Sequence, residues 1–298
     1  SNGAAYYYDN KMMIWASPLD FELRGSHRWL QNVITHEFAH IVSLQKAMKA
    51  GTSIPGAYLQ FMNYEEEKRP DVLYGYPNTL VSYPLPGTVV PPWLAEGTAQ
   101  YMYDDADWDN WDSHRDMILR DRVINNNLLS FTEMNTFGKK GIGNESTYNS
   151  GFALATYIAN EYGSDVLSKV MEELSSPLQF SINKAILSVT GTSGRDIYQD
   201  FKTAIEAKYN TLVDPIRVMP VQGEKLQIEG TTNIHPKWHP TENAYLYLSN
   251  KGNDYFGQTN LYYHDLNTGE DKKIKSGVFS APTWHSNGEI IYLSLIHI

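Results

Sequence analysis

Two histidines four residues apart, with a glutamate directly after the first, are the residues in this sequence best suited to chemistry. They are His36, Glu37 and His40, in a run that reads HEFAH. In an α-helix, residues four apart stand one turn above each other, so both imidazoles can bind one Zn²⁺. Glu37 can then act as a general base toward water that the metal activates. The alternative is a pair of structural histidines satisfied by hydrogen bonds.

The surrounding residues predict a buried helix. Ser26 is a suitable N-cap, and Gly51 ends the helix after two lysines. Apolar residues occur on every side of this helix, which predicts that it is buried all round. They are Trp29, Leu30, Val33, Ile34, Phe38, Ile41, Val42 and Leu44. Because a buried histidine pair and glutamate are costly without compensation, this context favours a metal site. The chain has no cysteine, so a metal has to be bound by His, Asp or Glu.

A second helix, predicted from Pro91-Pro92 onward, carries another candidate ligand. Its Glu96 stands among Ala95, Gly97 and Ala99. Small neighbours let this helix approach the histidine-bearing helix closely enough for a carboxylate oxygen to reach the metal. The alternative is a first-turn glutamate that the helix dipole stabilises.

Together the two motifs resemble those of the gluzincin metallopeptidases, specifically the peptidase MA-like group. That family pairs HExxH with a later glutamate in a W-x-x-E-G-x-A-x-Y setting, and here WLAEGTAQY follows HEFAH. The resemblance covers residues 10–212. It implies a mainly helical, zincin-like domain with Zn²⁺ held by His36, His40 and Glu96. It also implies hydrolysis of a peptide or protein substrate with Glu37 as the base.

Two related patterns are absent. Ser43 and Lys46 stand where the metzincins have a glycine and a third histidine. The G-x-M-E-N signature of the aminopeptidase gluzincins does not occur in residues 1–35. In the resembling family a tyrosine that enters a helix near the metal can stabilise the oxyanion, and the resemblance extends this role to Tyr148. A packed tyrosine with a bonded hydroxyl is the alternative, and His114 is a second candidate for the same role.

Two acidic stretches favour solvated surfaces over metal sites. Residues 104–116 contain six aspartates with the spacing of a calcium-binding EF-hand loop. However, Asn110 replaces the turn glycine and Asp116 replaces the final glutamate, so a solvated acidic loop is favoured over a calcium site. The run Glu65-Glu66-Glu67 is likewise expected to be a solvated face rather than a source of ligands.

The remaining sequence of the first part predicts one or two strands followed by helices. Residues 4–16 are rich in apolar and aromatic residues and predict the strands. Residues 52–92 show no sustained period, so short elements are expected there without definite positions. Helical periodicity predicts helices at 116–124, 150–162, 165–174, 178–189 and 195–210. The sequence Val213-Asp214-Pro215 then marks a domain boundary.

After this boundary the pattern changes to short strands with an internal repeat. Trp238 and Trp284 stand 46 residues apart, each in a similar Pro-x-Trp-His context. This interval is typical of a four-stranded propeller blade, and residues 265–270 predict a tight hairpin. The repeat resembles TolB-like β-propellers of bacterial envelope proteins. We therefore expect an α+β chain with a metallopeptidase domain at 1–213 and a truncated propeller of about one and a half blades at 214–298.

Composition restricts the partners. A net charge of −10 disfavours nucleic acid and anionic membrane surfaces. No apolar run of 18 residues occurs, so no membrane span is expected. The 21 tyrosines and 7 tryptophans favour a periplasmic, cell-envelope or secreted protein. The alternative function is a non-catalytic envelope scaffold that keeps a remnant peptidase fold and binds a protein partner through the propeller.

Overall fold

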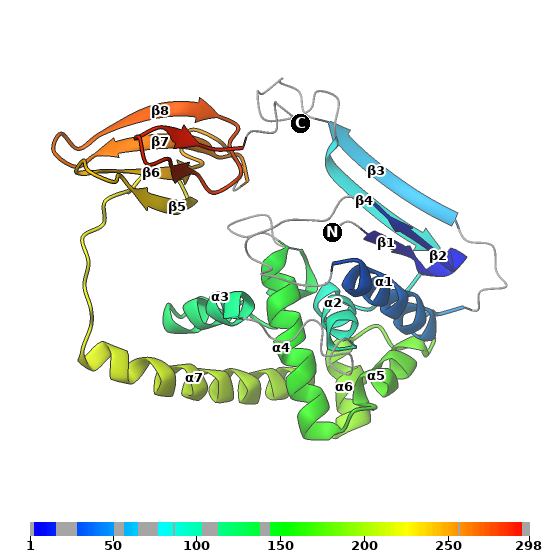
Figure 1. Ribbon diagram of the computed structural model, residues 1–298. Helices are drawn as coiled ribbons and strands as arrows, with labels where there is room; N and C mark the ends of the chain where they lie inside the picture. The colour runs from blue at the N-terminus through cyan, green and yellow to red at the C-terminus, as the bar shows by residue number, and fades with distance from the viewer. Residues whose placement is uncertain are drawn as a thin grey trace. The chain divides into compact units, whose positions relative to one another are not determined.

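The computed structural model describes residues 3–15, 29–50, 57–64, 77–85, 87–102, 113–137, 144–255 and 257–293. The chain forms two compact units, Ser1–Phe61 with Val81–Pro220 and Met62–Leu80 with Val221–Ile298. Helices dominate the first unit, and the second contains a four-stranded sheet (Figure 1). The expected α+β class is therefore confirmed. No helix in the described parts of the chain is long and apolar enough to cross a lipid bilayer.

The N-terminal strands form a hairpin that contacts the histidine-bearing helix. β1 (Gly3–Tyr6) pairs antiparallel with β2 (Lys11–Ile14), and the short 3₁₀ helix η1 (Tyr7–Asp9) lies between them. The turn ends at Asn10 with φ 50°, a left-handed conformation that asparagine tolerates. β1 packs on the first helix, α1 (Trp29–Lys46). The strands expected in residues 4–16 are thus confirmed.

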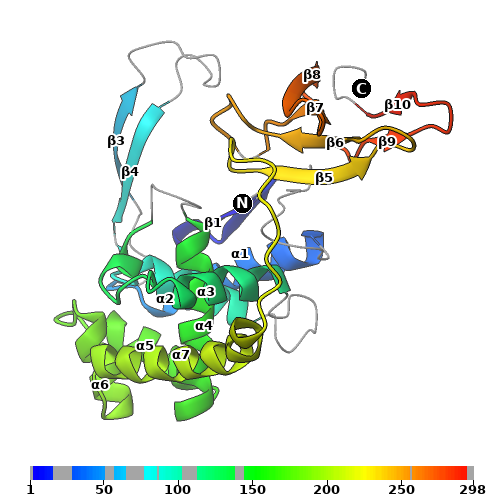
Figure 2. The same cartoon turned by 90° about the vertical axis from the view of Figure 1, so that its left-hand side faces the viewer.

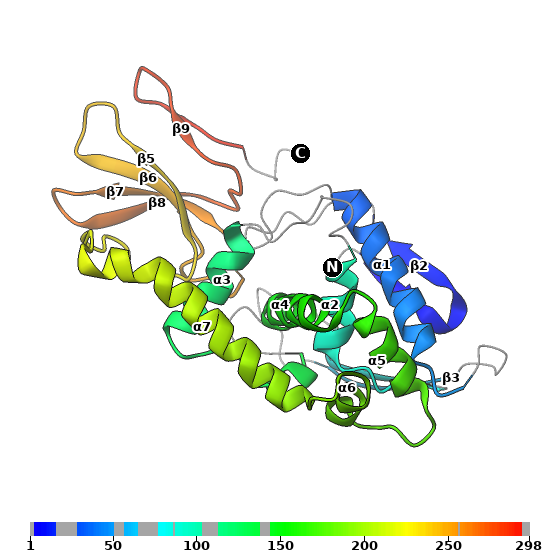
Figure 3. The same ribbon diagram turned by 90° about the horizontal axis from the view of Figure 1, so that it is seen from below.

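Seven α-helices occur in the described residues, and their order follows the sequence periodicity. After α1 they are α2 (Pro92–Tyr101), α3 (Ser113–Ile124), α4 (Glu145–Tyr162), α5 (Val166–Ser175), α6 (Ile182–Thr190) and α7 (Gly194–Val218). Between α1 and α2, strands β3 (Ala57–Tyr64) and β4 (Pro77–Leu85) pair with each other. α4 contacts α2, α3, α5 and α7 and so lies in the middle of the helices (Figure 3).

Several helix ends differ from those expected. α4 begins five residues before Ser150, because its first turns carry buried polar side chains that give no apolar period. α7 continues to Val218 and includes Pro215 in its last turn, where an interruption of the helix affects few residues. α1 ends at Lys46, before the expected Gly51. The proposed domain boundary at residues 213 and 214 stays a prediction.

The expectation that α1 is buried all round is wrong. Its metal-facing side is buried, but its opposite side carries a stripe of half-exposed apolar side chains at a spacing of four residues. The exposed fractions are Leu30 51%, Ile34 42%, Phe38 56% and Val42 53%. Apolar residues on every side make burial favourable but do not determine how many neighbours a helix acquires. In the described residues α1 contacts α2, α5 and the β1–β2 hairpin.

The core of the first unit centres on a close contact between α2 and α4. Trp93 of α2 is fully buried. A Cβ added to Gly151 of α4 would lie 2.5 Å from the carbonyl oxygen of Trp93, and one added to Gly97 would meet the carbonyl oxygen of Gly151. Both positions therefore require glycine, because any side chain would push the two helices apart. α2 is held against α4 at backbone contact.

The second unit is built on an antiparallel sheet in the order β5-β6-β7-β8. Its strands are β5 (Asn233–Trp238), β6 (Ala244–Ser249), β7 (Asn260–Asp265) and β8 (Glu270–Ser276). The hairpin expected at 265–270 is present, with Asp265 opposite Glu270 and Gly269 at φ 74°. Two short strands, β9 (Thr283–Trp284) and β10 (Ile290–Ile291), follow as a separate pair (Figure 2). The sheet is open and is not curled or closed into a propeller.

Candidate metal centre

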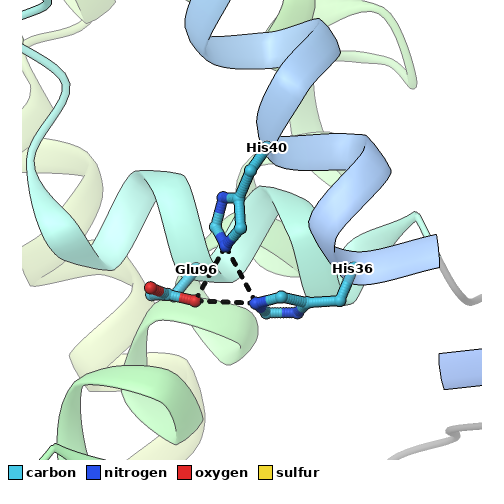
Figure 4. Close-up of side chains that lie close together, drawn as sticks. All are labelled: His36, His40 and Glu96. Carbon is cyan, nitrogen blue, oxygen red and sulfur yellow. Dashed lines mark hydrogen bonds and ion pairs between the residues drawn. The ribbon is translucent and has the colours of Figure 1, made fainter. Parts of the chain in front are cut away.

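Side chains from α1 and α2 converge on one buried point. The Nε2 atom of His36 lies 2.9 Å from the Oε2 atom of Glu96, and that of His40 lies 3.2 Å from the same oxygen (Figure 4). The two Nε2 atoms are themselves 2.9 Å apart. His36 is 7% exposed, His40 8% and Glu96 9%. The structure therefore brings together the three residues that the sequence identified, and they form a group that can hold a metal ion.

The triangle of donor atoms fits a metal ion better than a hydrogen-bonded cluster. A neutral imidazole nitrogen either donates or accepts a hydrogen bond. If both Nε2 atoms donate to Glu96, neither can accept from the other, so one of the three short contacts lacks a proton. Around a tetrahedral ion with bonds near 2.0–2.1 Å, ligand atoms stand about 3.3 Å apart. The three observed separations lie within a few tenths of an ångström of this value. Two nitrogens and a carboxylate oxygen are also a donor set suited to zinc.

Electrostatics show what the group requires when no metal is bound. Burial opposes ionisation of Glu96, but hydrogen bonds from His36 and His40 outweigh it and hold the pKa of Glu96 well below its usual range. Burial also opposes the charged form of His40, yet the hydrogen bond and charge of Glu96 raise the pKa of His40. The carboxylate thus stabilises positive charge beside it. A divalent cation satisfies the same requirement.

Small residues position Glu96, but not in the way expected. Gly97 permits close approach of α2 to α4, where it meets Gly151, rather than to α1. Ala99, which is fully buried, is also small. Glu96 still reaches the metal site as expected, because packing against α4 fixes the position of α2 and so places Glu96 beside the histidines of α1.

Glu37 is buried beside the triad and under the first strand. It is 3% exposed. Burial raises the pKa of Glu37, the negative charge of Glu96 adds to this rise, and His40 and a hydrogen bond from the backbone of Ala5 oppose it. A Cβ on Gly3 would lie 2.6 Å from the Oε1 atom of Glu37. β1 therefore passes directly over this carboxylate and restrains its orientation.

Tyr148 of α4 also lies at the site. Its ring is stacked on the imidazole of His36, with centroids 6.0 Å apart and an interplanar angle of 19°. The ring of Tyr148 also stacks with that of Phe137, with centroids 6.2 Å apart and an interplanar angle of 27°. Phe137 is 42% exposed, so an aromatic row runs from solvent to the triad. Sequence reasoning named Tyr148 but missed Phe137, since a lone phenylalanine before α4 carries no distinguishing pattern.

The other sequence-based candidates lie outside the residues whose side chains the structure describes. His114 belongs to α3, but its side chain lies outside the described residues. Glu65–Glu67 and the acidic loop before α3 also lie outside them. Their predicted roles, including the calcium alternative, stay predictions. Sequence reasoning also missed Gly3, Ala5 and Gly151, which act on the site through backbone contacts.

Comparison with known proteins adds no relative. No protein-family model, curated protein or solved structure matches this chain. What is shown is therefore the α+β fold and a buried His36–His40–Glu96 group within its helical unit.

Proposed function

We propose that this chain is a zinc-dependent peptidase with His36, His40 and Glu96 as the metal ligands. The observation that carries the proposal is the triangle of two imidazole nitrogens and one carboxylate oxygen, because hydrogen bonding alone does not satisfy its three edges. The HExxH motif and the later glutamate, which resemble those of the gluzincins, supply the reaction class. We propose zinc as this metal because two imidazole nitrogens and one carboxylate oxygen are a zinc donor set and because the motifs resemble those of zinc-binding gluzincins.

Each neighbouring side chain has a distinct role in this proposal. When bound, zinc supplies Lewis-acid polarisation of the scissile carbonyl and activates water as a nucleophile. Glu37 accepts the proton from the attacking water and delivers it to the leaving amine, a task that its raised pKa favours. The hydroxyl of Tyr148 donates a hydrogen bond to the oxyanion that forms on the carbonyl. Phe137 and Tyr148 present an aromatic surface to a side chain of the substrate.

We further propose that the second unit begins a TolB-like propeller in a cell-envelope protein and contacts a protein partner. Four antiparallel strands in sequence order are the arrangement of one blade. The two copies of the sequence repeat also share a hydrogen-bonding pattern, in which the histidine after the tryptophan accepts from the backbone of the following turn. The Nδ1 atom of His239 accepts from the backbone N–H groups of Thr241 and Glu242, and the Nδ1 atom of His285 accepts from the backbone N–H of Asn287. The pair β9–β10 would then open the next blade.

The proposal is tested by comparing zinc-loaded wild type with Glu37→Gln and with Glu161→Gln, which changes an exposed glutamate of α4. All three should hold about one zinc per chain by elemental analysis. Hydrolysis of an unstructured protein or a quenched peptide library should fall by about 10²–10⁴-fold in Glu37→Gln alone. Equal rates in all three at equal zinc content would exclude Glu37 from the reaction. Failure of the wild type to retain zinc would refute the metal site itself.

A further inference from the structure

A cavity in the first unit has no part in the proposed reaction. It has a volume of about 560 Å³ and lies between α3, α4 and α7. This volume is within the range of small-molecule sites, about 300–1,000 Å³. None of the triad residues lines it. The described residues that line it are Leu119, Phe152, Ala153, Thr156, Tyr157, Asn160, Phe201, Ala204, Ile205, Lys208 and Tyr209.

On α4 the cavity begins one turn after the metal centre, since Phe152 lines the cavity and Tyr148, four residues earlier, stacks on His36. The α4 residues that line the cavity recur at the spacing of one helical face, from Phe152 to Asn160. Gly151, by contrast, packs against α2, which carries Glu96. α4 contacts α2, α3 and α7 (Figure 3). A molecule in the cavity would therefore contact the helix that carries Tyr148 without entering the metal centre.

The walls of the cavity are apolar and aromatic. Phe152 comes from α4, Leu119 from α3, and Phe201 and Ile205 from α7. The rings of Tyr157 and Phe201 meet edge to face with centroids 5.6 Å apart and form part of this lining. Such walls favour the apolar body of a ligand, because its burial removes apolar surface from water.

The lining includes one positive charge, whose ion pair with Asp116 is long. Among the described lining residues only Lys208 carries a full charge. Its Nζ atom lies 3.7 Å from the Oδ1 atom of Asp116, which is beyond hydrogen-bonding distance. Asp116 already accepts from Arg120 at 2.9 Å and from the hydroxyl of Tyr209 at 2.8 Å. Asp116 thus shares its charge between Arg120 at 2.9 Å and Lys208 at 3.7 Å, and the longer pair leaves the Lys208 ammonium group able to bind a second anion in the cavity.

We propose that this cavity is a binding site for a small amphipathic carboxylate. The apolar body lies among the side chains of α3, α4 and α7, and the carboxylate pairs with the ammonium group of Lys208. A medium-chain fatty acid has this chemistry and is of suitable size. The apolar side chain of a partner protein is a different occupant, and it lacks the negative charge that Lys208 complements.

The experiment titrates the full chain with decanoate by calorimetry, below the concentration at which decanoate forms micelles. Decyltrimethylammonium, which has the same apolar chain and the opposite charge, is the matched ligand. Ala204→Trp fills the cavity from an exposed position of α7, and Ala207→Trp is its control at an exposed position of the same helix outside the cavity. Lys208→Gln removes the charge.

Decanoate should bind saturably to wild type and Ala207→Trp, and Ala204→Trp should abolish this binding. Because Lys208 is 56% exposed, Lys208→Gln should weaken decanoate binding by about three- to five-fold. The cationic ligand should bind more weakly than decanoate to the wild type, and its binding should not weaken further in Lys208→Gln.

Absence of saturable binding, or equal binding by the two tryptophan variants, refutes the site. Equal binding of the two ligands to wild type refutes the role of Lys208. A dimer that Ala204→Trp dissociates would instead assign the cavity to a protein interface and overturn the proposal.

Discussion

The ring of Tyr148 lies nearly parallel to the imidazole of His36, with 6.0 Å between the ring centroids. This stack fixes the ring, so the effect of its hydroxyl can be measured separately. Tyr148→Phe keeps the ring and should lower kcat by about 10²–10³-fold, the range for losing one oxyanion donor. Zinc content and KM should not change. Tyr148→Ala, which also removes the stack, is the comparison. A kcat of Tyr148→Phe equal to that of wild type would leave Tyr148 a packing residue.

Removal of the carboxylate ligand should reduce metal binding. Glu96→Ala leaves two imidazoles and should lower the zinc content from about one per chain, because structural and catalytic zinc sites use at least three protein ligands. Glu96→Asp keeps a carboxylate but shortens it, so intermediate occupancy is expected. The measurement is elemental analysis after dialysis against a weak chelator. Full zinc in Glu96→Ala would mean that the third ligand is another residue.

The sequence predicts the site residues that belong to a local motif, but not those that tertiary packing brings to the site. His36, Glu37, His40 and Glu96 were identified because their types and spacing within helices are informative by themselves. Phe137 and Ala5 were not, because they reach the site through tertiary packing of distant elements. The helical order was likewise predictable from periodicity. The exposed stripe on α1 was not, because the number of neighbours around a helix is a property of the whole fold.

The contact between α2 and α4 gives a prediction about stability. Gly151→Ala places a methyl group against the carbonyl of Trp93, which forces the helices apart and should destabilise the fold by about 1–3 kcal/mol. Zinc affinity should fall together with stability, since Glu96 moves with α2. Gly223→Ala is the control, because nothing lies within 4 Å of a Cβ at that position. Chemical denaturation of the metal-free proteins measures the stability, and zinc titration against a competing chelator measures the affinity; equal stability of the two variants would contradict the contact.

The aromatic row predicts a preference for the substrate. The ring centroids of His36 and Tyr148 are 6.0 Å apart and those of Tyr148 and Phe137 are 6.2 Å apart, so Phe137 lies no more than about 12 Å from His36. An extended peptide covers this distance with about four residues. Phe137→Ala should therefore reduce the preference for large apolar side chains within four residues of the scissile bond. Phe137→Leu should retain part of it. A quenched peptide library with each position varied in turn measures this. An unchanged preference profile would show that Phe137 does not contact the substrate.

The second unit should be sensitive to acid through Asp271. Burial raises the pKa of Asp271, but hydrogen bonds from Lys251 and His264 outweigh burial and lower it below the usual 3.8. A depressed folded-state pKa contributes stability that is present above the unfolded pKa and is lost as the pH falls through the folded one. Below about pH 3.8 the sheet of wild type should therefore lose stability faster than that of Asp271→Asn. Thermal unfolding at pH 5 and pH 2.5 tests this, and parallel losses in both proteins would contradict it.

The separation of the three ligands along the chain also means that they are synthesised at different times. Glu96 follows His36 by 60 residues, and at about 5–20 residues per second it is added about 3–12 s later. During that interval the nascent chain carries the histidine pair without its carboxylate. α4, whose Gly151 holds α2 in place, is made later still. We therefore expect the three-ligand site to be held in its final arrangement only after translation has passed α4, and we expect any metal bound before Glu96 is synthesised to rest on the histidine pair alone.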